Sequence, residues 1–290
     1  MAYEIGTASG HLDLLDKFNT FVTTGLASGE NWTLLADNTV SPFTAYESLF
    51  FWKAPGLSTL EEIYIGHYTN SSIASDWYNF YAFGTTGYVA GNTLATQPGY
   101  SGIVTIPAWN HEIPYWFVGN GQRAIIVVKV ETSYYFSYIG KIFPYTTPSQ
   151  WPYPVCIGGA ANGATSDRYS NTGLVNFWKG NVSQFKLRSI TGSWANYYTA
   201  PYGWSTEYLR NTTYSSAVAD GYYALLPITI LSSGYGISSG NIYGEFDGLY
   251  YISGYNNAVE NTIIIDTIPY LVVRDNTRTG FNDYVAVRLA

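Results

Sequence analysis

The chain has 290 residues, of which 18% are aromatic and only 11% are charged, whereas soluble domains average about 25% charged residues. Its net charge is −7 with 13 Lys and Arg, so it lacks the basic surface that phosphate binding needs, and we expect no nucleic acid partner. Cys156 is the single cysteine, which excludes an intrachain disulfide and a cysteine-based zinc site.

The first residues, MAYEIGTASGHLDLL, lack the basic and apolar regions of a secretory signal. No apolar run approaches the roughly 20 residues that span a bilayer. We therefore expect a soluble protein that is made in a cytoplasm and has no membrane span.

One segment near the N-terminus, HLDLLDKFNTFVTTGL, has the periodicity of an amphipathic helix. Its apolar side chains recur at steps of three and four residues: Leu12, Leu15, Phe18 and Val22. Ser9 is the candidate N-cap and Gly25 is the candidate stop signal. We expect this helix to begin the fold.

Short runs rich in β-branched and aromatic residues follow the helix, separated by Gly, Pro and Asn turns. In the first half they lie at 31–35, 47–54, 61–69, 76–83 and 124–142. In the second half they lie at 222–231, 244–253, 261–268, 270–275 and 283–290. The chain is therefore predicted to be mainly β.

Two of these runs carry more detail. In the first, Ile63, Ile65 and His67 alternate with the residues between them, which predicts a strand with these three side chains on its core face. The run 124–139 gives the strongest strand signal. It is too long for one flat strand, so we expect a bend or bulge within it.

The composition shifts toward Gly, Asn and Ser after residue 157. We predict an N-terminal amphipathic helix followed by two β-rich, sandwich-like lobes, in domains 1–157 and 158–290. One continuous domain is the alternative. No repeat of fixed period is present, which disfavours a solenoid, a propeller and a coiled coil.

The chain offers little for catalysis. A GxSxG elbow and a Walker loop are missing, and the three histidines are scattered without metal-binding spacing. Glu245 and Asp247, in GEFDG, have the spacing that places two carboxylates on one strand face, and a glycosidase needs such a pair. A surface strand or turn explains the same spacing more simply.

Near the C-terminus, RDNTRTGFNDY contains Asp275, Asn276 and Asp283, whose oxygens suit calcium. A calcium loop needs more ligands at fixed steps, so a hairpin turn at Gly280 is the favoured interpretation. We assign no catalytic residue, no cofactor and no metal.

Clusters of Tyr and Trp suggest two further roles. Exposed rings offer stacking faces for sugars, and the candidate glycan-stacking residues are Trp194, Tyr198, Tyr202 and Trp204. The same residue types are enriched at subunit interfaces, where Lys and Glu are depleted. With so little charge in the chain, we favour an interface.

The stretch IGKIFPYTTPSQWPYPVCIGG, residues 139–159, is the strongest interface candidate. Its four prolines fix an irregular path, and its glycines at 158 and 159 allow a close backbone approach. The predicted interface residues are Phe143, Tyr145, Trp151 and Tyr153. We expect a structural elbow between the lobes, packed on a neighbouring subunit or on the other lobe.

Three groups of segments resemble virion structural proteins of tailed bacteriophages, a tail- or baseplate-associated family. The first contains HLDLLDKFNTFVT, NWTLL, KAPGL and EEIYIGHY; the second is AIIVVKV with YIGKIFPYTTPSQWPYPVCIGG. The third contains GEFDGLYYISGYNNAVENTI and YLVVRDNTRTGFNDYVAVRLA. Cys156 departs from the aliphatic residue expected at its position, and the resemblance brings no catalytic residues.

The resemblance implies a non-enzymatic structural component of the virion, made in the bacterial host cytoplasm and placed in the tail or baseplate. Its expected partners are further copies of itself and other virion proteins of the tail tube, sheath, baseplate or fibre. The first alternative is a tail protein that recognises a host surface glycan. A capsid decoration protein and a polysaccharide depolymerase are the second alternative.

Overall fold

The structure is a computed structural model and describes residues 1–290 except 58–60, 148, 180–182, 203–217, 220–221 and 233–240. The described chain is mainly β, as predicted, and α1 (His11–Thr24) is its one α-helix. Short 3-10 turns lie at Phe43–Ala45, Ile73–Ser75, Leu94–Thr96 and Phe177–Lys179. No described helix is long and apolar enough to cross a membrane.

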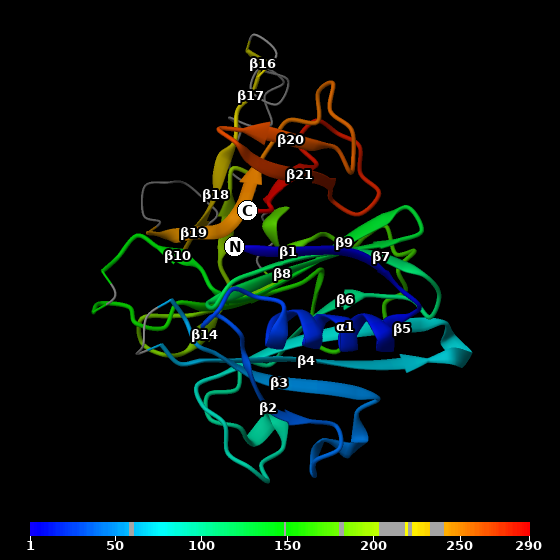
Figure 1. Ribbon diagram of the computed structural model, residues 1–290, viewed down its shortest axis with the longest axis vertical. Coiled ribbons are helices and arrows are strands. Elements are labelled where there is room, and N and C mark those ends of the chain that lie inside the picture. Colours follow the sequence, from blue (N-terminus) through cyan, green and yellow to red (C-terminus); the bar gives the residue numbers. More distant parts are fainter. Residues whose placement is uncertain (58–60, 148, 180–182, 203–217, 220–221, 233–240) are drawn as a thin grey trace.

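Three antiparallel sheets are stacked in layers (Figure 1). The middle layer, here called the central sheet, has the order β1 (Ala2–Ala8), β7 (Ile113–Gly119), β8 (Arg123–Val130), β9 (Ser133–Lys141), β11 (Val155–Gly158), β13 (Phe185–Arg188) and β14 (Trp194–Ala195). The helix-side sheet has the order β12 (Ala161–Asn162), β6 (Ile103–Pro107), β5 (Trp77–Thr85), β4 (Ile63–Ser72), β3 (Ser48–Ala54) and β2 (Thr33–Asp37).

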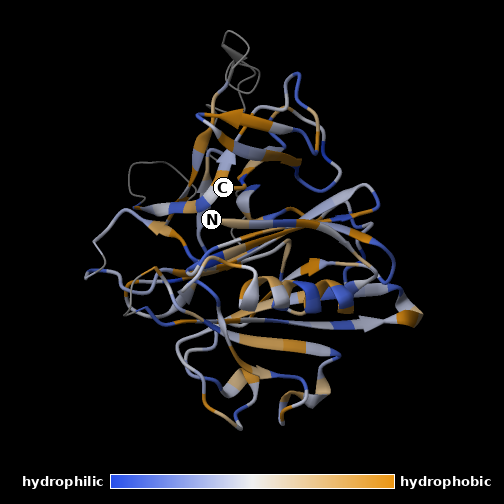
Figure 2. Ribbon diagram, in the orientation of Figure 1, coloured by the Kyte–Doolittle hydropathy of each residue, from blue (hydrophilic) through white to orange (hydrophobic). Residues whose placement is uncertain are grey.

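The third layer, the C-terminal sheet, has the order β15 (Tyr198–Ala200), β18 (Leu226–Leu231), β19 (Ile242–Tyr251), β22 (Tyr284–Arg288), β21 (Ile268–Arg274) and β20 (Thr262–Ile265). The short strand β10 (Phe143–Pro144) also pairs with β19. A separate ladder joins β16 (Val218–Ala219) to β17 (Tyr222–Tyr223). Figure 2 shows hydrophobic residues in the strands of each layer.

The central sheet is buried on both faces. In β8, Ile126 and Val128 belong to the core shared with α1 and the helix-side sheet. Ile125 and Val127 belong to the core shared with the C-terminal sheet, and none of the four is exposed. A strand covered on both sides needs an uninterrupted apolar run rather than alternation, which explains the strong signal of this segment.

The run 124–139 does not bend as one strand: it folds back on itself as the β8–β9 hairpin. Val130 is opposite Ser133, and Glu131 occupies the turn with a φ of +54°. Tight hairpin turns require positive φ and therefore favour Asn, Asp or Gly there. Because Glu131 is none of these residues, the sequence did not predict a turn there.

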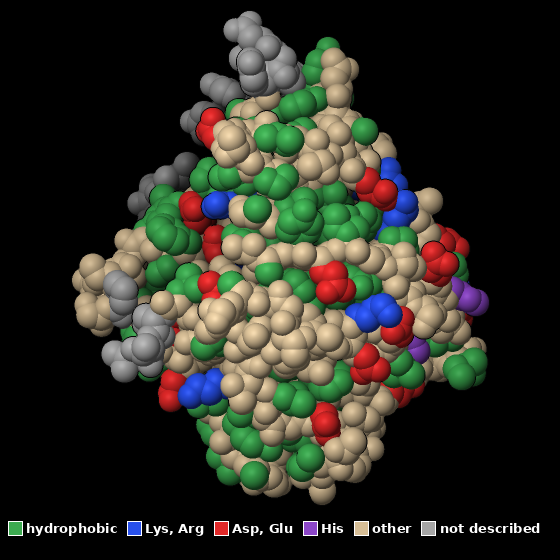
Figure 3. Space-filling model, in the orientation of Figure 1, with side chains coloured by type: hydrophobic (Ala, Val, Ile, Leu, Met, Phe, Trp, Pro, Cys, Tyr) green, Lys and Arg blue, Asp and Glu red, His purple; other side chains and the backbone are tan. Residues whose placement is uncertain are grey.

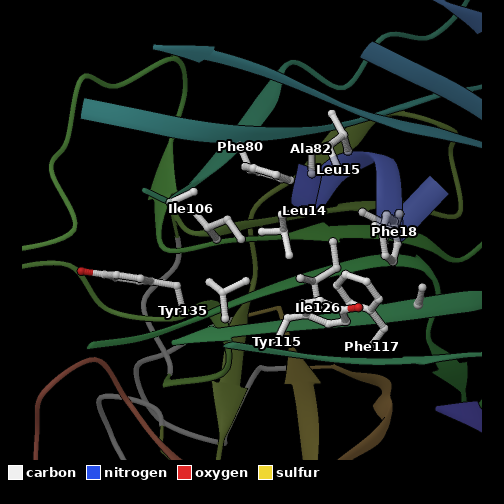
Figure 4. Packing of buried hydrophobic residues seen from close by; sticks show 14 of the residues in the cluster. Leu14, Leu15, Phe18, Phe80, Ala82, Ile106, Tyr115, Phe117, Ile126 and Tyr135 are labelled. Atoms are coloured by element: carbon white, nitrogen blue, oxygen red, sulfur yellow. The ribbon is translucent and has the colours of Figure 1, made fainter. Parts of the chain in front are cut away.

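The helix α1 lies between the helix-side and central sheets (Figure 4). Leu14 and Phe18 point into a core that contains Phe80 of β5 and Ile126 of β8. The expected core residues Leu15, Phe18 and Val22 are buried, but Leu12 is 44% exposed. The buried face of the helix is therefore rotated from the expected one: it includes Leu14 and Phe21 and excludes Leu12.

The two ends of α1 differ from the expectation. The fold begins with β1 rather than with the helix, and the N-cap is Gly10, which has no side chain to cap with. Asp13 instead reaches back and accepts the Ser9 N–H at 2.7 Å. Gly25 ends the helix as predicted, donating its N–H to the Phe21 carbonyl.

The expected lobe boundary between residues 157 and 158 falls inside β11. This strand pairs with β9 on one side and with β13 on the other. The central sheet therefore contains strands from both sides of that boundary. Two separate sandwich-like lobes are not confirmed, and the observed arrangement is three layers that share one middle sheet.

His67 of β4 lies in the core, as its alternation with Ile63 and Ile65 predicts, and all three side chains are fully buried. Its Nε2 is 2.9 Å from the Ser137 hydroxyl of β9, so the histidine joins the helix-side sheet to the central sheet. Nδ1 has no hydrogen-bond partner among the described residues. Burial lowers the pKa of His67 to about 3, so the ring is neutral at physiological pH.

We expect His67 to make the protein less stable as the pH falls. The unfolded ring gains a proton below its ordinary pKa of 6.5 and the folded ring only near 3, so stability is lost progressively between those values. From pH 8 to pH 5 this loss is about 2 kcal/mol. In urea unfolding at both pH values, wild type should therefore lose about 2 kcal/mol more than His67→Gln. The control is His111→Gln, at an exposed histidine, which should lose as much stability as wild type. If His67→Gln also loses as much stability as wild type between pH 8 and pH 5, the lowered pKa of His67 is contradicted.

Candidate functional site

A cleft lies where the three layers meet beside β10, and it has a volume of about 640 Å³. We call it the β10 cleft. Its lining residues come from both termini of the chain, the loop before β8, the end of β9, β10 and β19: Met1, Glu30, Leu57, Asn120, Gln122, Lys141, Ile142, Phe143, Pro144, Thr146, Asp247, Arg288 and Ala290. It thus includes residues from the two segments that the sequence singled out, 139–159 and GEFDG.

An ion pair joins the central sheet to the C-terminal sheet behind this cleft. The Arg123 side chain is fully buried, and its Nε donates to the Asp247 carboxylate at 2.9 Å. Gly248, with a φ of +85°, is needed there because a Cβ on it would lie 2.5 Å from the guanidinium. Arg123 Nη1 has no partner among the described residues. Asp247 is therefore the carboxylate that compensates a buried charge.

A second ion pair joins the central sheet to the helix-side sheet. Lys141, the last residue of β9, pairs with Glu61, which lies just before β4. Glu61 also accepts the Leu57 N–H at 2.8 Å, and this fixes the loop that carries Leu57 to the rim of the cleft. Both side chains are largely buried, so the pair holds two layers in a fixed position.

Phe143 lines the cleft, and the Tyr145 ring lies beside it, with ring centroids 6.4 Å apart. They are 54% and 50% exposed. Phe143 is opposite Glu245 in the β10–β19 ladder, and the Tyr145 O–H donates to the Glu245 carboxylate at 2.6 Å. Burial and this carboxylate raise the pKa of Tyr145 to about 12, so the hydroxyl keeps its proton.

Trp151 and Tyr153, the other two predicted interface residues, are used within the chain. Trp151 is only 2% exposed, donates its Nε1–H to the Arg188 carbonyl at 3.0 Å and packs its ring on Tyr243 of β19. Tyr153 is half-buried under the Arg188 guanidinium. The segment thus pairs with both the central sheet and the C-terminal sheet. Of the four predicted interface residues, Phe143 and Tyr145 are the exposed ones.

The expected close approach at Gly158 and Gly159 is confirmed. A Cβ at Gly158 would lie 2.7 Å from the Phe177 ring, and one at Gly159 would lie 2.8 Å from the Thr105 carbonyl. Cys156 is fully buried, and burial raises the pKa of its thiol, so it remains a protonated core side chain.

None of the three candidate glycan-stacking residues that the structure describes is an exposed residue. Trp194 donates to the Gly99 carbonyl at 2.7 Å and its ring lies against Gly84. Tyr202 packs between the Trp178 and Tyr251 rings, and Tyr198 is half-buried in β15. Trp204 lies outside the described residues. The Trp194 and Tyr202 rings therefore pack within the chain.

The acidic residues near the C-terminus are held by cations of the chain. The Asp275 carboxylate accepts the Asn176 side-chain N–H at 2.9 Å and pairs with Arg278, and Asp283 pairs with Lys179. Among the described residues, no three side chains of His, Cys, Asp or Glu come together as metal ligands. The observed contacts stabilise loops, as the hairpin interpretation of this segment requires.

Comparison with protein-family models and with curated protein sequences found no match to this chain. The comparisons therefore do not test the resemblance to virion proteins of tailed bacteriophages, which stays a prediction from the sequence segments.

Removing the Asp247 carboxylate should destabilise the fold strongly, because Arg123 would remain buried without a counter-charge. We expect Asp247→Leu to lower the free energy of unfolding by about 3 kcal/mol. The matched control Glu245→Gln changes only a rim contact and should cost less than about 1 kcal/mol. Combining Arg123→Met with Asp247→Leu should recover part of the loss. Urea unfolding measures the free energy of unfolding of all three variants. Equal losses for Asp247→Leu and Glu245→Gln would contradict the role assigned to the Arg123–Asp247 ion pair.

Proposed function

We propose that this protein is a non-enzymatic structural component of a tailed-bacteriophage virion, of the tail or baseplate, and that it binds a neighbouring virion protein through the rim of the β10 cleft. The binding surface, here called the β10 surface, consists of Leu57, Phe143 and Tyr145. The observation that carries the proposal is the exposure of these three large side chains, 57%, 54% and 50%. Leu57 and Phe143 line the cleft, and the Tyr145 ring lies beside Phe143.

The β10 surface is held in place before any partner arrives. Tyr145 is fixed by its O–H bond to Glu245 and by its N–H bond to the Tyr243 carbonyl at 3.0 Å. The backbone of Phe143 is held by the β10–β19 ladder, and the backbone of Leu57 by the bond from its N–H to Glu61. Ordering side chains costs free energy on association, and anchors that are already ordered avoid much of that cost. Aromatic anchors of this kind contribute most of the binding energy at interfaces.

The charged residues around the cleft support a structural role. Asp247 and Lys141 neutralise partners within the chain, and Glu245 accepts from Tyr145. A glycosidase needs two carboxyl groups whose protons are free to exchange with substrate and water. Here the two carboxylates of GEFDG hold β8 and β10 in place, so the same residues are better explained as parts of the scaffold.

The layered core also suits a particle protein. The described chain stabilises three sheets by burying apolar side chains, with Cys156 buried and unpaired. Such a protein needs no oxidising compartment to reach its stable state. This agrees with a chain that folds in a bacterial cytoplasm and then functions outside it as part of a virion.

Binding to tail particles tests the proposal directly. We expect purified wild-type protein to co-sediment with tails or baseplates of its virion, and the Phe143→Ser, Tyr145→Ser double variant to bind at least about tenfold more weakly, as loss of interface anchors predicts. Ile73→Ser is the matched control, because Ile73 is 82% exposed at the tip of the β4–β5 hairpin. It should bind like wild type.

Two outcomes would argue against the proposal. One is a folded wild-type protein that binds no part of the particle in sedimentation and light scattering. The other is an equal loss of binding in the double variant and in Ile73→Ser, since this would show that the β10 surface has no special role.

A further inference from the structure

The strand β1 forms one edge of the central sheet. All seven of its residues, Ala2–Ala8, pair with β7 in a continuous antiparallel register. No described residue outside β7 hydrogen-bonds to the backbone of this strand. An edge of this length presents a row of free N–H and C=O groups that can pair with another strand.

This edge lacks the devices that usually block strand addition. Proteins place Lys, Pro, a bulge or an outward charge on such strands. In β1 the only charged residue is Glu4, whose carboxylate accepts the Tyr115 O–H at 2.6 Å. The register with β7 has no shift. Nothing in β1 itself therefore opposes pairing.

Two other edge strands of the described structure, β2 and β20, have features that oppose pairing. The β2 edge has a register shift between Leu34 and Ala36. The β20 edge carries Ile264, which is 71% exposed, but Glu260 and Asp266 flank the strand. In an antiparallel pair of two β20 strands, Asp266 of each copy would lie near Glu260 of the other, and the Lys129–Glu260 ion pair only partly compensates these charges.

The outward side chains of β1 are apolar where a partner would lie. Tyr3 is 49% exposed and Ile5 is 56% exposed. They are opposite Val118 and Trp116, whose side chains point toward the C-terminal sheet. Tyr3 and Ile5 share that face, and Figure 3 shows hydrophobic side chains gathered between β1 and β21. An exposed apolar strip thus runs along the free edge.

We propose that β1 pairs in antiparallel fashion with β1 of a second copy of this chain, around a two-fold axis at Ile5. In this register Ile5 is opposite Ile5 of the second copy, Glu4 is opposite Gly6, and Tyr3 is opposite Thr7. The only charge of each strand then faces a glycine. A register centred on Glu4 would set two carboxylates against each other, which is unfavourable.

A two-fold contact of this kind uses the same patch on both copies and closes on itself. A single strand pair is a small interface, of the weak class that buries less than about 1,200 Å². We therefore expect a dimer that depends on protein concentration. The contact needs no other virion protein, so the purified protein tests it and the result leaves the proposed virion role untouched.

A cysteine at the two-fold axis tests both the contact and its register. Directly opposite residues of an antiparallel pair have Cα atoms about 4.5 to 5.5 Å apart, within the roughly 4.4 to 6.8 Å that a disulfide spans. Ile5→Cys should form a disulfide-linked dimer under mild oxidation. The native Cys156 does not interfere because it is fully buried.

The matched control is Ile264→Cys on the edge strand β20, because Ile264 is 71% exposed and therefore more accessible than Ile5 at 56%. Ile5→Cys should crosslink at least about tenfold faster, because pairing raises the effective concentration of the two thiols. Ile5→Lys should abolish the concentration-dependent dimer in light scattering, and Ile264→Lys should not. Equal crosslinking rates of the two cysteine variants, or a wild type that stays monomeric at every concentration, would overturn the proposal.

Discussion

The burial of the central sheet on both faces is the constraint on which the rest of the structure depends. The inner strands β8 and β9 have charged residues at their ends: Arg123 begins β8 and Lys141 ends β9. Both lie beside the β10 cleft. Arg123 pairs with the C-terminal sheet through Asp247, and Lys141 pairs with the helix-side segment through Glu61. These two ion pairs therefore lie close to one cleft, which Lys141 and Asp247 line.

Local patterns in the sequence predicted individual elements well. The alternation around His67 identified β4 and its core face, because Ile63, Ile65 and His67 share one buried face of the strand. The stacking of three sheets was not predictable in this way. The apolar run in β8 is compatible with any strand covered on both sides, and the pairing of β1 with β7 joins residues more than a hundred positions apart. Glu131 concealed the hairpin because glutamate rarely adopts its conformation.

The candidate site was predictable only in part, because aromatic composition does not reveal which rings are exposed. Trp151 and Trp194 are polar enough to be expected at a surface, yet each donates its indole N–H to a backbone carbonyl within the chain. Phe143, which has no such group, is the exposed one. Arg123 was missed altogether. The pattern that could have indicated it is an arginine at the start of the apolar run of β8. An arginine buried at such a position needs a carboxylate from elsewhere in the chain.

The two edges of the central sheet differ, and this difference limits how copies can assemble. The far edge is β14, which has two residues and packs its Trp194 ring on the neighbouring layer. Only β1 offers a full-length edge. Sheet pairing through β1 would therefore stop at two copies rather than extend into a filament. Met1, next to β1, lines the β10 cleft, so the two clefts would lie at opposite ends of the paired strands, each with its own Phe143 and Tyr145.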